Sequence, residues 1–163
     1  MGGISVLLLM GILSAIFFIF LAIFIVIVIY QIITYIFESF AIMEMGKNLQ
    51  YKVVGTAWIP FYNKYLLGKI AQHKVLGVIL AILNVVIVIT GIGSYVQNDL
   101  NAILFGSFLI CVFASFILDS IIAHKIYTKA IGKYGDILTV FGVLTLGFLR
   151  PIFLFVVKNK IKS

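Results

Sequence analysis

Charge is almost absent from the first part of the chain. No Asp, Glu, Lys or Arg precedes Glu38. Over all 163 residues, 10% are charged and 64% are hydrophobic, whereas a typical soluble domain carries about 25% charged residues. Together with the mean hydropathy of +1.27, this excludes an ordinary soluble globule and predicts an integral membrane protein.

Cysteine and acidic residues are also scarce. The single cysteine, Cys111, lies inside an apolar run, which excludes a disulfide framework. No Lys or Arg precedes Lys47, and the first apolar run is too long for a cleaved secretory signal, so we expect the N-terminus to be retained. Basic residues outnumber acidic ones by 12 to 5 but are spread along the loops. This favours anionic membrane lipids, and no nucleic acid, as partners.

Four apolar runs are long enough to cross a membrane as helices, which takes about 20 residues each. Backbone amides need partners in lipid, and the runs lack the alternation of barrel strands, so helices are expected. We predict an all-α fold, a bundle of four transmembrane helices forming a single polytopic domain over residues 1–163. The spans are expected near residues 12–37, 75–96, 102–122 and 137–157. Asn84, Thr90, Ser107 and Ser115 are expected to contribute hydrogen bonds between the second and third helices.

The lysines predict the orientation of the spans. Residues 38–74 carry five lysines and residues 125–133 carry three, whereas the turn at 97–101 carries none. The positive-inside rule therefore makes the 38–74 loop cytoplasmic and the N-terminus external. We expect a multi-pass protein of a bacterial cytoplasmic membrane.

The C-terminal lysines conflict with four full crossings, because they would then lie outside. Arg150 and Pro151 interrupt the fourth run, and proline removes a helical hydrogen bond. A full span is the preferred interpretation, and a kinked or re-entrant segment is the alternative. The first run is longer than one crossing needs, so we expect a tilted helix that continues past Glu38 and stops at Gly46.

The most distinctive local sequence covers residues 56–70, within the cytoplasmic loop. Its Trp and Tyr side chains prefer the headgroup region, and Pro60 suits the first turn of a helix. We predict an in-plane amphipathic helix. Its apolar face would carry Phe61, Tyr65 and Leu66, and its polar side Asn63, Lys64 and Lys69.

This segment resembles one in a family of small, uncharacterised multi-pass membrane proteins of Gram-positive bacteria. The shared pattern is Trp-x-Pro-x-x-Asn-x-Tyr-x-Leu-Gly-Lys-Ile. The residues that match it are Trp58, Pro60, Asn63, Tyr65, Leu67, Gly68, Lys69 and Ile70. A looser similarity covers residues 125–129 and the basic tail, and Glu38 departs from the family by being acidic. The resemblance implies a multi-pass architecture and no mechanism.

Three charged residues at or near the edges of apolar runs are candidate sites. Glu38 and Asp119 each end an apolar stretch and are each followed by Ser, which hints at a two-helix repeat. Arg150 lies within the fourth run. Charges at a membrane edge are costly unless they are solvated or paired, so these residues are candidates for an ion or substrate entry. The favoured, ordinary explanation is snorkelling toward the headgroups or, for Glu38 and Asp119, carboxylates bridged by lysine.

His73 and His124 lie at similar distances from the turn at 97–101, so an antiparallel helix pair would place them at the same depth. Together with Glu44 or Asp119 they are weak candidates for a transition-metal site. Two interfacial histidines without a metal are the favoured interpretation, and we expect no metal and no cofactor.

Catalytic sequence patterns are missing, including His-Glu-x-x-His and a glycine-rich phosphate loop. We therefore expect a non-enzymatic protein that binds another membrane component. Examples are an immunity protein against a membrane-active toxin and an accessory subunit of a transport or secretion complex. The expected contact residues are Trp58, Pro60, Phe61, Asn63, Tyr65 and Lys69. The alternative is a small oligomeric channel or transporter, a homo-oligomer with Glu38 and Asp119 at its cytoplasmic entrance.

Overall fold

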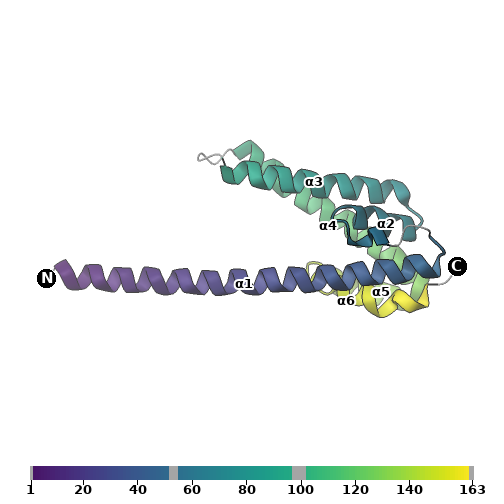
Figure 1. The fold of residues 1–163 in the computed structure, drawn as a ribbon, viewed down its shortest axis with the longest axis horizontal. Coiled ribbons are helices and arrows are strands. Elements are labelled where there is room, and N and C mark those ends of the chain that lie inside the picture. The colour runs from purple at the N-terminus through teal and green to yellow at the C-terminus, as the bar shows by residue number, and fades with distance from the viewer. Residues whose placement is uncertain (1, 52–54, 97–101, 162–163) are drawn as a thin grey trace. The chain divides into compact units, whose positions relative to one another are not determined.

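The computed structural model describes residues 2–51, 55–96 and 102–161, and within them the fold is all-helical, as predicted (Figure 1). The α-helices are α1 (Gly2–Asn48), α2 (Tyr62–Ile70), α3 (Lys74–Val96), α4 (Ala102–Ile131), α5 (Tyr134–Leu144) and α6 (Arg150–Val157). Two short 3-10 helices, η1 (Gly55–Trp58) and η2 (Lys158–Lys160), precede α2 and follow α6.

Three stretches of helix are long and apolar enough to cross a membrane: Leu8–Asn48, Lys74–Gly93 and Ala102–Ile131. The predicted count of four is not confirmed, because the fourth run does not form one helix in the structure. It divides into α5, which ends at Leu144, and α6, which begins at Arg150. The 11 residues of α5 extend about 16 Å, roughly half of a hydrocarbon core.

The chain divides into two compact units, residues 1–36 and residues 37–163. The first unit is a single stretch of α1. Side chains from Leu8 to Ile29 are exposed at every position, so no face of this stretch is covered. An apolar helix without a polar face is typical of membrane-embedded segments.

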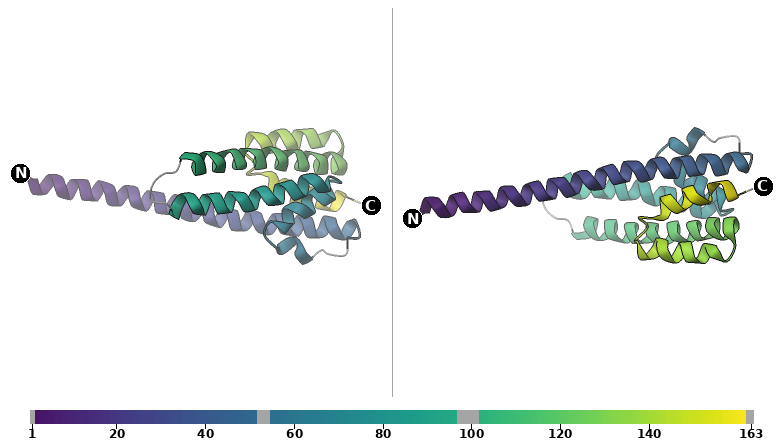
Figure 2. Two further views of the ribbon diagram at one scale, coloured as in Figure 1. Left: turned by 90° about the horizontal axis from the view of Figure 1, so that it is seen from above. Right: turned by 90° about the horizontal axis from the view of Figure 1, so that it is seen from below.

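The second unit is built on α3 and α4, which lie side by side and antiparallel, with α5 along α4 (Figure 2). Midway along the pair, Asn84 Nδ2 donates to Ser115 Oγ at 3.2 Å, a hydrogen bond between these helices of the kind that was expected. Ser107 Oγ instead donates to the Leu104 carbonyl of its own helix. The buried core gathers where α2, the end of α1, the end of α4, and α6 meet. Its largest members include Ile42, Met45, Leu67, Leu80, Ile126, Tyr127 and Leu154.

The turn after α5 reverses the chain and returns it to the core. Leu146 and Gly147 have φ angles of 51° and 84°, and the Gly147 amide donates to the Gly142 carbonyl at 2.8 Å. Pro151 then occupies the first turn of α6, where its missing amide hydrogen costs nothing. Beyond α6, Asn48 Nδ2 donates to the Lys158 carbonyl at 3.3 Å. The basic tail therefore lies at the same end of the second unit as the end of α1.

Three local predictions are wrong. Gly46 does not stop α1, which continues to Asn48, and Gln50 adopts the left-handed conformation after it, with φ of 56°. Helix α2 starts at Tyr62, so Pro60 precedes the helix. The predicted polar side of this helix also faces inward, because Asn63 is only 3% exposed.

Glycines allow α2 to pack directly on α3. A Cβ atom at Gly68 would lie 2.3 Å from the Gly77 Cα, and one at Gly77 would lie 2.8 Å from the Gly68 Cα. Atoms do not approach this closely, so either substitution must push the backbones apart. The contact fixes where α2 lies, and with it the position of Lys64.

We predict that Gly68→Ala destabilises the protein by about 1–3 kcal/mol, the usual range for overpacking. Thermal unfolding of the detergent-solubilised chain measures the effect. Gly106→Ala on α4 is the matched control, because a Cβ there meets nothing within 4 Å. It should be neutral or stabilising by up to about 1 kcal/mol, since alanine favours helix over glycine. Equal losses in the two variants would contradict the close α2–α3 contact as the cause.

A second prediction concerns the tail. In a Cys111→Ser background, cysteines at Lys160 and Lys47 should react with an impermeant thiol reagent from the same side of the membrane. Both positions are exposed and belong to the end where Asn48 meets Lys158. Ile103→Cys, at the opposite end of α4, should react only from the other side. If Lys160→Cys instead reacts from the same side as Ile103→Cys, residues 137–157 cross the membrane fully.

Candidate functional site

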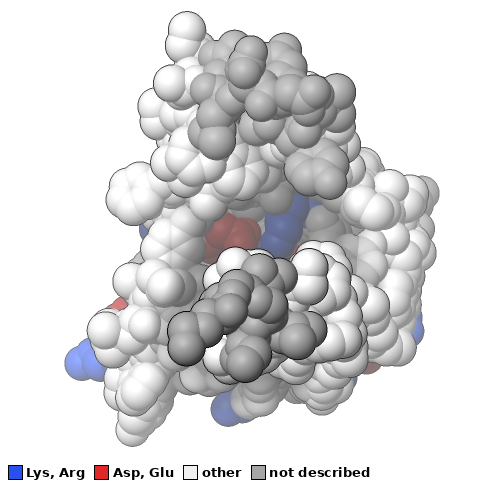
Figure 3. Space-filling view, turned by 90° about the vertical axis from the view of Figure 1, so that its left-hand side faces the viewer, with Lys and Arg blue, Asp and Glu red and all other residues white. Residues whose placement is uncertain are grey.

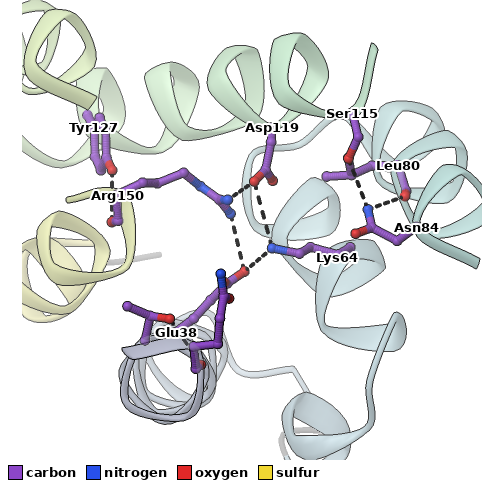
Figure 4. A network of polar contacts seen from close by, with 10 residues as sticks. Glu38, Lys64, Leu80, Asn84, Ser115, Asp119, Tyr127 and Arg150 are labelled. Atoms are coloured by element: carbon purple, nitrogen blue, oxygen red, sulfur yellow. Dashed lines mark hydrogen bonds and ion pairs between the residues drawn. The ribbon is translucent and has the colours of Figure 1, made fainter. Parts of the chain in front are cut away.

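Four charged side chains from four helices form one buried cluster in the second unit (Figure 4). Glu38 comes from α1, Lys64 from α2, Asp119 from α4 and Arg150 from the first residue of α6. We call this set the charge cluster. Its side chains are 7%, 16%, 17% and 10% exposed, respectively, so each charge is largely removed from solvent.

Each acid of the charge cluster contacts both bases. Lys64 Nζ lies 2.7 Å from Glu38 Oε1 and 3.7 Å from Asp119 Oδ2. Arg150 Nη2 donates to Glu38 Oε1 at 3.2 Å, and Arg150 Nη1 pairs with Asp119 Oδ2. The two positive and two negative charges sum to zero, which is the condition under which burying them is tolerable.

The neighbouring structure places these side chains. The Tyr127 hydroxyl on α4 donates to the Arg150 carbonyl at 3.2 Å and so ties the start of α6 to α4 (Figure 4). The rings of Phe37 and Phe155 stack edge to face, with centroids 5.0 Å apart, which joins α1 to α6. Lys64 reaches the cluster because Gly68 and Gly77 hold α2 against α3.

Burial changes the acid–base behaviour of Lys64. It lowers the pKa of the Lys64 ammonium to about 8, the Glu38 carboxylate opposes that lowering, and the Arg150 guanidinium adds to it. The ammonium therefore remains protonated at pH 7, and the charge cluster stays balanced there.

The cluster does not satisfy all of its polar atoms. Within the described part of the chain, Asp119 Oδ1 and Arg150 Nε are buried without a hydrogen-bond partner. A cavity of about 10 Å³ beside Arg150 is lined by residues that include Ser120, Tyr127 and Thr139. Its size suits one water molecule.

The sequence-predicted residues Glu38, Asp119 and Arg150 thus come together. Glu38 and Asp119 were expected at the same membrane edge, and lysine bridging was one explanation for them, whereas Arg150 was expected near the other end of the fourth run. Lys64 completes the site and was assigned to the polar, solvent-facing side of its helix. Both acids contact cations of the same chain. Pairing of this kind lowers the cost of placing a charged side chain at a membrane edge.

The two histidines occupy different surroundings. His124 Nδ1 lies 3.0 Å from Thr139 Oγ1 and 3.8 Å from Asp136 Oδ1, whereas His73 lies beside Tyr51 and Lys69 at the start of α3. No group of three or more His, Cys, Asp or Glu residues that could hold a metal occurs within residues 2–51, 55–96 and 102–161.

The residues of the 56–70 segment divide between the core and the surface. Trp58 and Pro60 are exposed, and the Trp58 ring packs edge to face on Phe40 with centroids 5.1 Å apart. Phe61 and Tyr65 are half-buried and Asn63 is buried. Lys69 Nζ lies 4.4 Å over the Tyr51 ring and is therefore in contact with an aromatic face.

Charge is otherwise nearly absent from the surface that Figure 3 shows. Most of the described atoms on that face are uncharged, and acidic and basic atoms are few. Exposed side chains on α3, α4 and α5 include Ile82, Ile110 and Val140.

Comparison of the chain with protein-family models, with curated proteins and with solved structures gives no match. The fold and the charge cluster define a helical protein with three helices able to cross a membrane, held together at one end by buried ion pairs. The resemblance of residues 58–70 to a Gram-positive membrane family stays a prediction.

We predict that charge balance, more than any single ion pair, stabilises this site. Arg150→Met or Asp119→Leu alone should destabilise the protein by about 3–5 kcal/mol, because each leaves an unpaired buried charge. The double variant restores neutrality and should recover most of that loss. Unfolding of the detergent-solubilised protein measures all three.

Lys47→Met is the control for this experiment, because Lys47 is exposed and lies 3.8 Å from the exposed Glu44. It should cost less than about 1 kcal/mol. Additive losses in the Arg150→Met/Asp119→Leu double variant would contradict the role of charge balance.

Proposed function

We propose that the chain is a non-enzymatic membrane protein that binds another protein within the same membrane. The observation that carries the proposal is the uncovered apolar surface of α1. None of the most apolar window of this helix is buried, and Phe17, Phe20 and Phe24 are all exposed. Helices in a bilayer associate by close packing, so a long helix left unpacked offers a lateral binding surface.

The state of the polar groups supports the same proposal. Glu38, Lys64, Asp119 and Arg150 neutralise one another, and they leave little charge for binding a substrate. What remains at the surface is mainly apolar and aromatic, including Trp58 and Tyr62. Aromatic side chains of this kind are frequent at the centres of protein interfaces. An immunity protein and an accessory subunit of a transport or secretion complex are two concrete forms of such a protein.

The proposed topology has three crossings, by α1, α3 and α4, with the N-terminus outside a bacterial cytoplasmic membrane. In it α5 and α6 enter the membrane from the cytoplasmic side and return. The hydrogen bond from Asn48 to the Lys158 carbonyl supports this arrangement. It brings the tail lysines to the same side as the lysines of residues 38–74 and 125–133, in agreement with the positive-inside rule.

The alternative of a channel with Glu38 and Asp119 at its entrance has weaker support. An acidic entrance attracts cations when its carboxylates face the pathway unpaired. Here Lys64 and Arg150 already occupy both carboxylates. Cation binding would require displacing those side chains at the cost of leaving buried charges unpaired.

The test uses a photo-crosslinking amino acid in the native membrane. At Phe20 or Phe24 of α1 it should yield one discrete crosslinked protein, because a specific partner packs against a defined face. At Ile82 on α3 and Ile110 on α4 it should yield lipid adducts only. Shuffling the order of residues 8–29 keeps their composition and should abolish the crosslink.

The shuffled variant must retain the folded second unit, which its thermal unfolding checks. A crosslink that survives shuffling would reflect nonspecific proximity and would contradict the proposal. Lipid adducts alone at all four positions would contradict it as well.

A further inference from the structure

A groove that the charge cluster does not use runs along the seam between α4 and α5. Two adjoining hollows, of about 460 and 360 Å³, share His124, Thr139 and Val143. Apolar walls are formed by Phe116, Ile117 and Ile121 of α4 and by Val140, Val143 and Leu144 of α5. The volumes fall within the range of small-molecule sites. We call this feature the α4–α5 groove.

Glycine sets the shape of the groove. Where α5 begins, a Cβ atom at Gly135 would lie 2.5 Å from the Thr128 amide nitrogen, so the helices touch backbone to backbone there. About two turns further along α5, Val140 and Val143 line the hollows. The seam is thus closed at its lysine-bearing end and has free space farther along.

Both walls change from apolar to basic in the same direction. On α4, Ile117, Ile121, Lys125 and Lys129 follow one another at intervals of four residues and lie on one face. On α5, Leu144, Val140 and Ile137 form a comparable line that leads back to Lys133. All three lysines are exposed. His124 Nδ1 and Thr139 Oγ1 lie 3.0 Å apart, where the apolar lining ends and the polar residues begin.

A groove that changes from apolar to basic along its length is complementary to a phospholipid, which has apolar acyl chains and an anionic headgroup. We propose that the α4–α5 groove binds an anionic phospholipid, with an acyl chain against Val143 and Phe116 and the phosphate beside Lys125, Lys129 and Lys133. The charged residue that lines the hollows is Asp136, and the three lysines are exposed beyond the lining, toward the closed end of the seam. Three positive charges against that one carboxylate provide the charge complementarity. A basic residue near a membrane surface contributes about 1 kcal/mol toward anionic lipid. This site does not depend on whether α1 binds a protein.

Native mass spectrometry of the full chain in mild detergent tests the site. Phosphatidylglycerol and phosphatidylcholine with identical acyl chains are titrated in parallel. The chain should bind phosphatidylglycerol more tightly by about tenfold or more, since each lysine contributes about fivefold. Replacing Lys125, Lys129 and Lys133 by Gln should remove this preference.

Val143→Trp fills the apolar part of the groove and should reduce the binding of both lipids. Its control is Ile110→Trp, at a residue on α4 that is 71% exposed and lies outside the groove lining. The control for the lysines is the Gln variant at Lys47, Lys74 and Lys160, three exposed lysines elsewhere. Both controls should keep the wild-type preference and occupancy.

Equal binding of the two lipids by the wild-type chain would overturn the proposal. If the two lysine variants lose the preference for phosphatidylglycerol equally, the proposal is also overturned. The preference would then come from the overall charge of the chain and not from the lysines at the groove. If Val143→Trp does not elute as a folded protein, the wild-type comparison and the two lysine variants still decide the outcome.

Discussion

Arg150 contacts carboxylates on two different helices, Glu38 on α1 and Asp119 on α4, and the arrangement of the second unit depends on that placement. A buried guanidinium without partners costs several kcal/mol, so α6 is stable only where both acids are within reach. Lys64 on α2 then balances the remaining negative charge. The requirement for neutrality thereby joins four elements that are far apart in sequence, with 112 residues between Glu38 and Arg150.

That requirement also explains why the last apolar run returns. A straight helix over residues 137–157 would carry Arg150 toward the opposite end of the unit, away from Glu38. The left-handed turn at Leu146 and Gly147 reverses the chain first, and Pro151 starts the new helix. The Tyr127 hydroxyl holds the Arg150 carbonyl at the point of return. Lys158 then lies beside Asn48, at the same end of the second unit as the end of α1.

Length and hydropathy were sufficient to predict the long helices, and the polar residues in the middle of the second and third apolar runs predicted hydrogen bonds between these helices, of which Asn84 to Ser115 is one. The same criteria failed for the fourth run, because counting apolar residues ignores a reversal that two residues of positive φ produce. They also failed for Lys64 and Asn63. An amphipathic pattern shows that a helix has a polar side, but which side faces inward depends on the charges that other helices bring to it. Glu38, Asp119 and Arg150 could be recognised as costly, yet their pairing depends on contacts that span most of the chain.

The charge cluster and the α4–α5 groove lie on different sides of α4, and this separation has a physical basis. Asp119 and Ile122 turn toward the core, whereas Ile117, Ile121 and Lys125 are exposed on the outer face. The lysines outside the cluster therefore have little buried acid to pair with, and Asp136 is the one carboxylate at the groove, 3.8 Å from His124. The free energy of exposed lysines near a membrane surface is lowered by contact with anionic headgroups. The chain thus neutralises its buried cations internally and leaves Lys125, Lys129 and Lys133 exposed.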